Sequence, residues 1–207
     1  MTTTLQSLGP GFATTLVRLA LPARIDPKGA AALMLSESGL VPSARNSIGC
    51  VGINQLCGSS QRVFAPLSVA QYRSLSASGQ LPYVFRFWNS LNRKGAAWLS
   101  GRDLYWLNFL PATYVPGAPD SHVIVPPGSG YYAANASLDH GHKGYITAGD
   151  LWIALANAMH KNPALWNALS AAIDGAELKT GVATFGVVVL AGLAVGAMGY
   201  LAVQEAA

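Results

Sequence analysis

A stretch without a single charged residue, from Val182 to Val203, constrains this chain more than any other feature of its sequence. It has about the 20 residues that a helix needs to cross roughly 30 Å of hydrocarbon. Gly192 and Gly196 form a GxxxG pair within it, a spacing at which two helices approach closely. The sequence therefore predicts a membrane-inserting helix over residues 182–203. The alternative is a helix buried inside a protein assembly.

The remaining sequence has the composition of a folded domain. The chain has 207 residues, of which 51 % are apolar and 11 % are charged, against roughly 25 % charged residues in an average soluble domain. Its formal net charge is +4, which suits contact with an anionic polymer but also ordinary solubility. Because no run of Lys and Arg occurs, we expect no specific nucleic-acid partner.

Helical patterns dominate, so the predicted fold class is mainly α. Asp26 and Pro27 are typical of a helix start, and Gly39 of a helix end. We expect three parts, namely a lead-in over residues 1–25, a helical domain over 26–175 and the hydrophobic helix with its tail over 176–207. Between Asp26 and Gly39, Ala30, Ala31, Leu33 and Met34 predict one apolar helix face. Further helices are expected over 71–92, 102–110 and 150–174, with a short strand at Val123–Val125.

Cysteine and histidine patterns give no sign of a metal site or cofactor. Cys50 and Cys57 are expected to be two mostly buried thiols, and the alternative is a disulfide between them. Residues 139–150 have the frame of a calcium-binding EF-hand loop, but Lys143 stands where the ion needs an oxygen ligand. We therefore expect a metal-free loop with His140 and Lys143 facing solvent.

The chemistry centres on residues 35–56. There, Glu37-Ser38 at a predicted helix end is followed by Pro42, Ala44, Ser47 and Gly49, and then by Gly52-Ile53-Asn54-Gln55. This stretch resembles the lytic transglycosylases of the Slt type, which are related to goose-type lysozyme, with Asn54 replacing the usual Met. A third family element, Ala-Tyr-Asn-x-Gly-Pro, is matched at Asn108 and Pro111 but not at Leu107 and Leu110. The match covers roughly residues 25–155 and looks closest to versions carried in phage virions.

The resemblance implies a lysozyme-like helical domain that binds peptidoglycan glycan strands, with Glu37 as the catalytic acid. A glutamate partly enclosed by apolar groups can hold a proton near neutral pH. Enzymes of this family use one glutamate as acid and then as base and release 1,6-anhydro products. Ser38, Gln55 and Asn108 would orient the acid or bind the glycan, and Tyr105 and Tyr114 are candidates for the family's groove tyrosine.

Several residues also have plain structural interpretations. Gln55 and Asn108 can simply tie loops together. We expect four tryptophans to lie in the core rather than to bind sugar, namely Trp88, Trp98, Trp106 and Trp152.

The leading functional hypothesis is a phage virion transglycosylase that opens the wall locally during genome delivery. Its expected location is the virion, followed by the host periplasm and inner membrane, with a second copy or another virion protein on the Gly192/Gly196 face. Residues 1–20 do not resemble a secretory signal, which favours this hypothesis over a bacterial membrane-anchored enzyme. The alternative is a structural or ejected virion protein with a transglycosylase-like fold and little or no activity.

Overall fold

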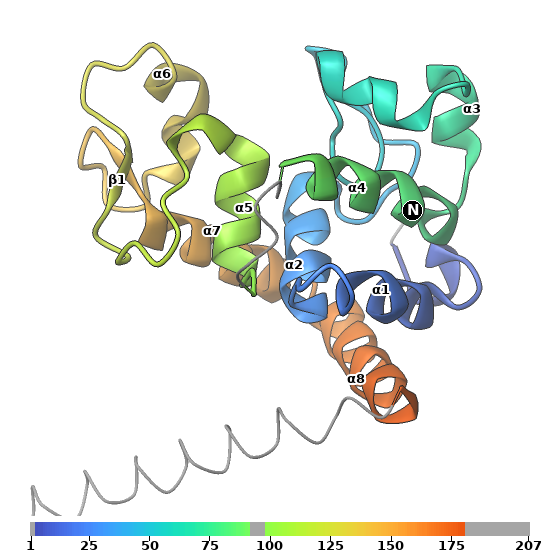
Figure 1. The fold of residues 1–207 in the computed structure, drawn as a ribbon. Coiled ribbons are helices and arrows are strands. Elements are labelled where there is room, and N and C mark those ends of the chain that lie inside the picture. Colours follow the sequence, from blue (N-terminus) through green and yellow to red (C-terminus); the bar gives the residue numbers. More distant parts are fainter. Residues whose placement is uncertain (1–2, 92–97, 181–207) are drawn as a thin grey trace, which may run out of the picture.

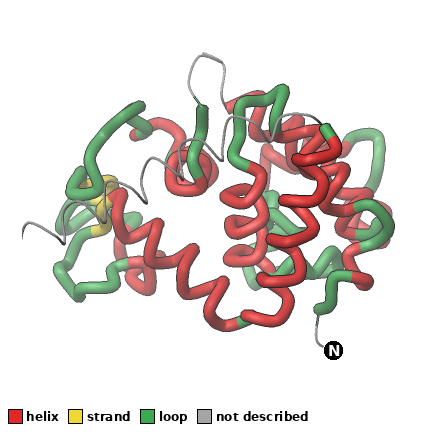
Figure 2. The backbone as a smooth tube through the Cα atoms, turned by 90° about the horizontal axis from the view of Figure 1, so that it is seen from below, coloured by secondary structure: helices red, strands yellow, loops and turns green. Residues whose placement is uncertain are grey.

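The structure, a computed structural model, describes residues 3–91 and 98–180. Helices joined by long loops make up most of it, which confirms the mainly α fold class (Figures 1 and 2). In chain order the elements are η1 (Gln6–Leu8), α1 (Phe12–Ala20), α2 (Pro27–Ser38), η2 (Gly58–Phe64), α3 (Val69–Ser74), α4 (Ala77–Leu91), α5 (Gly101–Phe109), η3 (Pro111–Thr113), β1 (Val123–Val125), α6 (Tyr132–Asn135), η4 (Ala136–Leu138), β2 (Ile146–Thr147), α7 (Ala148–Lys161) and α8 (Pro163–Lys179).

Helix α2 lies at the centre of the fold, in contact with α1, α5, α7 and α8 (Figure 1). The Asp26 side chain caps its start by accepting a hydrogen bond from the Lys28 backbone N–H at 3.0 Å. Gly39 ends it with φ 65, a conformation that glycine adopts without steric cost. Both predicted ends are confirmed. The predicted apolar face is buried, and the burial extends beyond it, because Ala32 and Leu35 are buried as well and several helices pack around α2.

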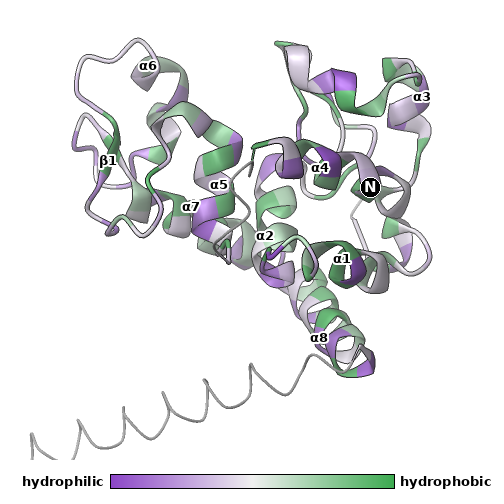
Figure 3. Ribbon diagram, viewed as in Figure 1, coloured by the Kyte–Doolittle hydropathy of each residue, from purple (hydrophilic) through white to green (hydrophobic). Residues whose placement is uncertain are grey.

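Residues 5–25, expected to be a lead-in, contribute to the same core. Helix α1 buries Phe12, Leu16, Val17 and Ala20 and packs against α8 and α4. Helix α8 continues to Lys179, and its buried residues recur every three to four positions, so that hydrophobic and hydrophilic segments lie side by side along it in Figure 3.

Two of the predicted helices are each divided into two. The stretch expected over residues 71–92 forms α3 and α4, because the Ser76 hydroxyl accepts a hydrogen bond from the Gly79 backbone N–H at 3.1 Å and begins a new helix. The stretch expected over residues 150–174 forms α7 and α8. Pro163 has no backbone N–H and disfavours a helical conformation at Asn162, so α7 ends there.

The predicted strand at Val123–Val125 is confirmed as β1, which pairs antiparallel with β2. Of the four tryptophans expected in the core, Trp88 and Trp106 are buried there, whereas Trp98 and Trp152 are exposed and that expectation was wrong for them.

Among the described residues, no helix has the length and apolar character needed to cross a membrane. The predicted membrane helix over residues 182–203 lies outside the described residues, so it stays a prediction.

Candidate active site

Helices α2 and α5 start side by side. A short backbone bridge joins their leading residues, because the Leu99 N–H donates to the Arg24 carbonyl at 2.8 Å and the Asp26 N–H donates to the Leu99 carbonyl at 3.0 Å. One turn further on, Gly29 of α2 packs against Gly101 of α5 so closely that a Cβ on Gly29 would lie 2.5 Å from the Gly101 Cα. Two glycines thus let the helix backbones touch.

At the other end of these two helices, Glu37 meets Asn108. The Asn108 Nδ2 donates a hydrogen bond to Glu37 Oε1 at 3.2 Å. The Asn108 Oδ1 in turn accepts from Asn54 Nδ2 at 2.8 Å and from Trp88 Nε1 at 3.2 Å. The structure therefore brings together the acid and the asparagine that the sequence singled out on separate elements.

Burial changes the protonation of the Glu37 carboxyl group. The side chain is only partly exposed, and its burial raises the pKa of the carboxyl group to about 7, against an opposing effect of the hydrogen bond from Asn108. Burial disfavours the charged form, and a donor to the carboxylate favours it. A carboxyl group with this pKa is protonated in a large fraction of molecules near neutral pH.

The two candidate tyrosines lie in different places. Tyr105 is buried near Glu37: burial and the Glu37 charge raise the pKa of Tyr105 to about 12, which a hydrogen bond with the Ser36 side chain opposes. Tyr114 instead packs edge-on against Trp106, with ring centroids 5.5 Å apart. Of the two candidate tyrosines, Tyr105 is therefore the one that lies near Glu37.

The loop after α2 is fastened to the helix through Ser38. The Ser38 hydroxyl donates to the Ile53 carbonyl at 2.8 Å. From the other side, the buried Gln80 of α4 accepts a hydrogen bond from the Ile53 N–H through its Oε1 at 2.9 Å. Ser38 thus acts on the loop, where the sequence suggested a role in orienting the acid or the substrate.

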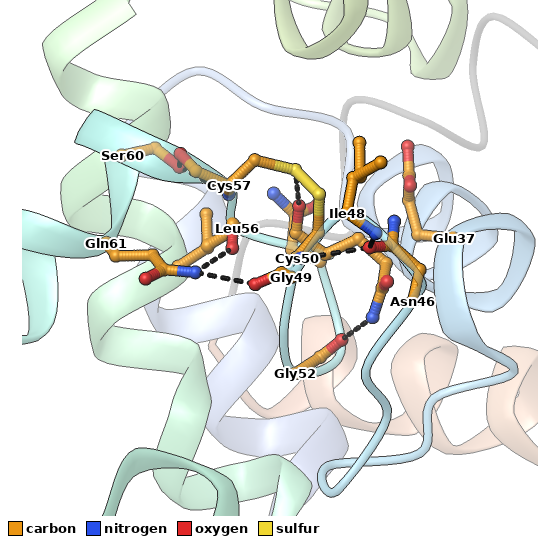
Figure 4. Close-up of a disulfide and its surroundings, with 12 residues drawn as sticks. Glu37, Asn46, Ile48, Gly49, Cys50, Gly52, Leu56, Cys57, Ser60 and Gln61 are labelled. Atoms are coloured by element: carbon orange, nitrogen blue, oxygen red, sulfur yellow. Dashed lines mark hydrogen bonds between the residues drawn. A yellow bond between two sulfur atoms is a disulfide. The ribbon is translucent and has the colours of Figure 1, made fainter. Parts of the chain in front are cut away.

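A disulfide between Cys50 and Cys57 closes this loop (Figure 4). The expectation of two buried thiols was wrong, since Cys57 lies on the surface and both sulfur atoms are bonded to each other. The Asn46 Oδ1 accepts hydrogen bonds from the backbone N–H groups of Ile48 and Cys50, at 3.1 and 2.9 Å. Ile48 is 82 % exposed, and in Figure 4 its side chain points the same way as that of Glu37.

Gln55 folds back on its own loop, where its Nε2 donates to the Gly52 carbonyl at 2.9 Å. This contact fits the structural interpretation of Gln55 as a loop tie. Gly52 itself requires glycine, because φ is +78 and a Cβ would lie 2.6 Å from Gln80 Oε1.

The other carboxylates that the sequence places in this half of the chain lie at the opposite ends of the helices. Asp26 caps the start of α2, and α2 is long enough to put it about 16 Å along the axis from Glu37. Asp103 lies in the first turn of α5, where it accepts from Ser100 Oγ at 2.7 Å and pairs with Arg102 at 3.0 Å. Paired carboxylates of glycosidases lie within about 10 Å of each other, so Asp26 does not form such a pair with Glu37.

In the EF-hand-like loop, the ammonium group of Lys143 pairs with the two aspartates. Lys143 Nζ lies 2.8 Å from Asp139 Oδ1 and 2.9 Å from Asp150 Oδ1, and both aspartates are almost fully buried. Lys143 is exposed, as expected, but its ammonium group is not simply solvated, because it pairs with both carboxylates. His140 is half-buried. Among the described residues, no group of His, Cys, Asp and Glu side chains could hold a metal ion.

Three contributors to the site were not recognised from the sequence. Asn54 was noted only as a departure from Met, Trp88 only as a core residue, and Gln80 not at all. Trp88 is indeed buried, but its indole N–H serves the site. A polar side chain within the Gly-Ile-Asn-Gln segment was the one available signal, since a buried amide needs hydrogen-bond partners.

No family model matches this chain, and no curated protein or solved structure matches it either. Its function is therefore inferred from the geometry and chemistry of the site, together with the motif resemblance.

Proposed function

We propose that this chain is a peptidoglycan lytic transglycosylase of the Slt type, with a lysozyme-like domain carried in a phage virion and Glu37 as its acid and base. The observation that carries the proposal is the Glu37–Asn108 contact at 3.2 Å, made by a carboxyl group whose pKa burial raises to about 7. The two residues come from separate elements of the family motif, which supports the resemblance.

In the proposed reaction, protonated Glu37 gives its proton to the glycosidic oxygen as the bond to the MurNAc anomeric carbon breaks. The Glu37 carboxylate then takes the proton from the C6 hydroxyl of the same sugar as that oxygen attacks the anomeric carbon. The products are a 1,6-anhydro end and a free hydroxyl on the leaving sugar. Glu37 regains its proton, no water is consumed, and one carboxyl group suffices.

Digestion of purified sacculi by the full-length chain tests the proposal, with mass analysis of the released fragments. We expect fragments lighter by one water than hydrolytic products, and we expect Glu37→Gln to abolish their release. Because the acid must start protonated, the rate should fall as pH rises through about 7. Glu177→Gln is the matched control, since Glu177 lies on α8 and should leave activity unchanged.

Three results would count against the proposal in different ways. Full activity of Glu37→Gln would remove Glu37 from the mechanism. Reducing-end products would point to hydrolysis with a second carboxylate. No product from the wild-type chain would favour a structural virion protein.

Insertion of residues 182–203 into the host membrane stays part of the proposal, and deletion of that stretch should eliminate carbonate-resistant binding to liposomes.

A further inference from the structure

The side chain of Asn108 is held in one orientation by its neighbours. Its Oδ1 accepts from Trp88 Nε1 at 3.2 Å and from Asn54 Nδ2 at 2.8 Å. An indole N–H can only donate, so the atom that faces it must be the carbonyl oxygen of the amide. The amide nitrogen of Asn108 therefore faces Glu37 Oε1, as a donor at 3.2 Å.

Asn54 is poorly explained as a residue that stabilises the fold. Its side chain is 1 % exposed, yet its Oδ1 has no hydrogen-bond partner among residues 3–91 and 98–180. A buried polar atom without a partner lowers stability, and an apolar side chain of the same size would avoid that loss. What Asn54 does provide is the shorter of the two hydrogen bonds that hold Asn108.

The loop that carries Asn54 is itself tightly fixed. The neighbouring Ile53 is bound at both backbone groups: its N–H donates to Gln80 at 2.9 Å, and its carbonyl accepts from Ser38 at 2.8 Å. The Cys50–Cys57 disulfide closes the loop around it. Asn54 thus presents its donor from a rigid support, as a positioning group requires.

We propose that Asn54 is a positioning residue for the acid, which acts through Asn108 to tether Glu37 Oε1 and leave Oε2 to carry the proton. The proposal rests on the proposed function. We call the two consecutive hydrogen bonds from Asn54 to Asn108 and from Asn108 to Glu37 the relay. The motif that residues 52–55 resemble has Met where this chain has Asn54, so the relay is a feature of this chain.

Loss of the Asn54 hydrogen bond should raise the pKa of Glu37. Without the Asn54 donor, the Asn108 Oδ1 keeps one of its two hydrogen bonds from described residues, that of Trp88, and the hydrogen bond from Asn108 to Glu37 becomes weaker or less populated. Since that hydrogen bond lowers the pKa of Glu37, the pKa rises when the bond weakens. A general acid with a higher pKa stays protonated to higher pH, so the alkaline limb of the rate profile moves upward.

The test uses Asn54→Leu in the full-length chain, with Asn54→Met as a second variant in case the first does not fold. We measure the titration of the Glu37 carboxyl carbon by NMR, the pH profile of product release and Tm. We expect the Glu37 pKa to rise by about 0.5 to 1 unit, with an equal shift of the alkaline limb. We expect kcat to fall while KM changes little, and Tm to stay the same or increase.

Two comparisons separate positioning from general damage. Asn167→Leu on α8, an exposed residue, makes the same chemical change away from the site and should shift nothing. Asn108→Leu should raise the Glu37 pKa further than Asn54→Leu does. If Asn54 acts through Asn108, adding Asn54→Leu to Asn108→Leu should produce no further shift. An additive shift would overturn the relay.

The outcomes keep the two proposals apart. If the wild-type chain releases no 1,6-anhydro product but Asn54→Leu shifts the Glu37 titration, the relay stands and the proposed function is wrong. If the wild-type chain is active and neither Asn54 variant moves the titration or the pH profile, the relay is wrong and the proposed function stands. A loss of Tm without a titration shift would assign Asn54 a purely structural role and overturn the proposal.

Discussion

The substitution Gly29→Ala tests whether contact between α2 and α5 positions the acid. A Cβ on Gly29 would lie 2.5 Å from the Cα of Gly101 and 2.6 Å from its N, whereas ordinary contacts span 3.4–4 Å. The third obstructing atom, at 2.8 Å, is Oδ2 of the Asp26 side chain that caps α2. Because the two nearest atoms are backbone, the helices must separate by roughly 1 Å. Overpacking of this kind costs about 1–3 kcal/mol. Alanine recovers up to about 1 kcal/mol through its higher helix propensity.

We therefore expect Gly29→Ala to lower the free energy of unfolding by about 1–2 kcal/mol. The displacement also matters for the site. The Asn108–Glu37 hydrogen bond is 3.2 Å long, so a separation of roughly 1 Å carries it out of range. The variant should release product more slowly than its loss of stability explains, since nearly all molecules remain folded under assay conditions.

Urea unfolding followed by tryptophan fluorescence measures the stability change, and sacculus digestion measures the activity. Gly175→Ala is the matched control: it also lies inside a helix, but no atom of the described residues lies within 4 Å of the added Cβ. It should stabilise the protein by up to about 1 kcal/mol and leave activity unchanged. If Gly29→Ala is stabilised like Gly175→Ala, the close approach of α2 and α5 does not exist as described.

Two further predictions concern charge. Burial raises the folded-state pKa of Glu37 from 4.5 to about 7, so ionisation of Glu37 opposes folding. In urea titrations, Glu37→Gln should therefore gain stability over wild type as pH rises from 4.5 to 7, by about 3 kcal/mol at pH 8. A stability difference between the two proteins that does not change with pH would show that Glu37 has an ordinary pKa. Lys143→Met should lower the urea midpoint at neutral pH far more than Lys28→Met, whose ion pair is exposed, because it leaves the Asp139 and Asp150 carboxylates buried without their cation. Lys143 lowers the pKa of both carboxyl groups in the folded state, so the difference in urea midpoint between wild type and Lys143→Met should narrow as pH falls below 3.8. Equal midpoints of these two proteins at every pH would contradict the pairing of Lys143 with the two carboxylates.

Local signals were sufficient for the features that local chemistry decides. The cap at Asp26, the αL glycine at Gly39 and the strand at Val123–Val125 are each set by neighbouring residues, and each is found where the sequence placed it. The start of α5 was predicted within one residue, and in the structure Ser100 lies just before it and caps it.

Packing decided what the sequence could not show. A run of small and aliphatic residues predicts a helix but does not reveal that other helices cover it on all sides. The break near Ser76 depends on a side-chain cap, and the break at Asn162 depends on Pro163. At both places the surrounding residues still favour a continuous helix, so the sequence pattern alone did not show the break. The loop 139–150 begins and ends with Asp139 and Asp150, but the sequence did not show that Lys143 between them would pair with both, at 2.8 and 2.9 Å.

The Glu37–Asn108 contact follows from matched helix lengths, which is why neither motif alone could reveal it. Glu37 lies eight residues after Gly29, and Asn108 lies seven residues after Gly101. At 1.5 Å per residue these intervals are about 12 and 10.5 Å. These two side chains therefore lie at about the same distance from the Gly29–Gly101 contact, and the structure shows that they meet there. Removing one turn from either helix would offset the pair by about 5.4 Å, beyond any hydrogen bond. The contact therefore depends on the distance of Glu37 from Gly29 and of Asn108 from Gly101, which neither motif element contains.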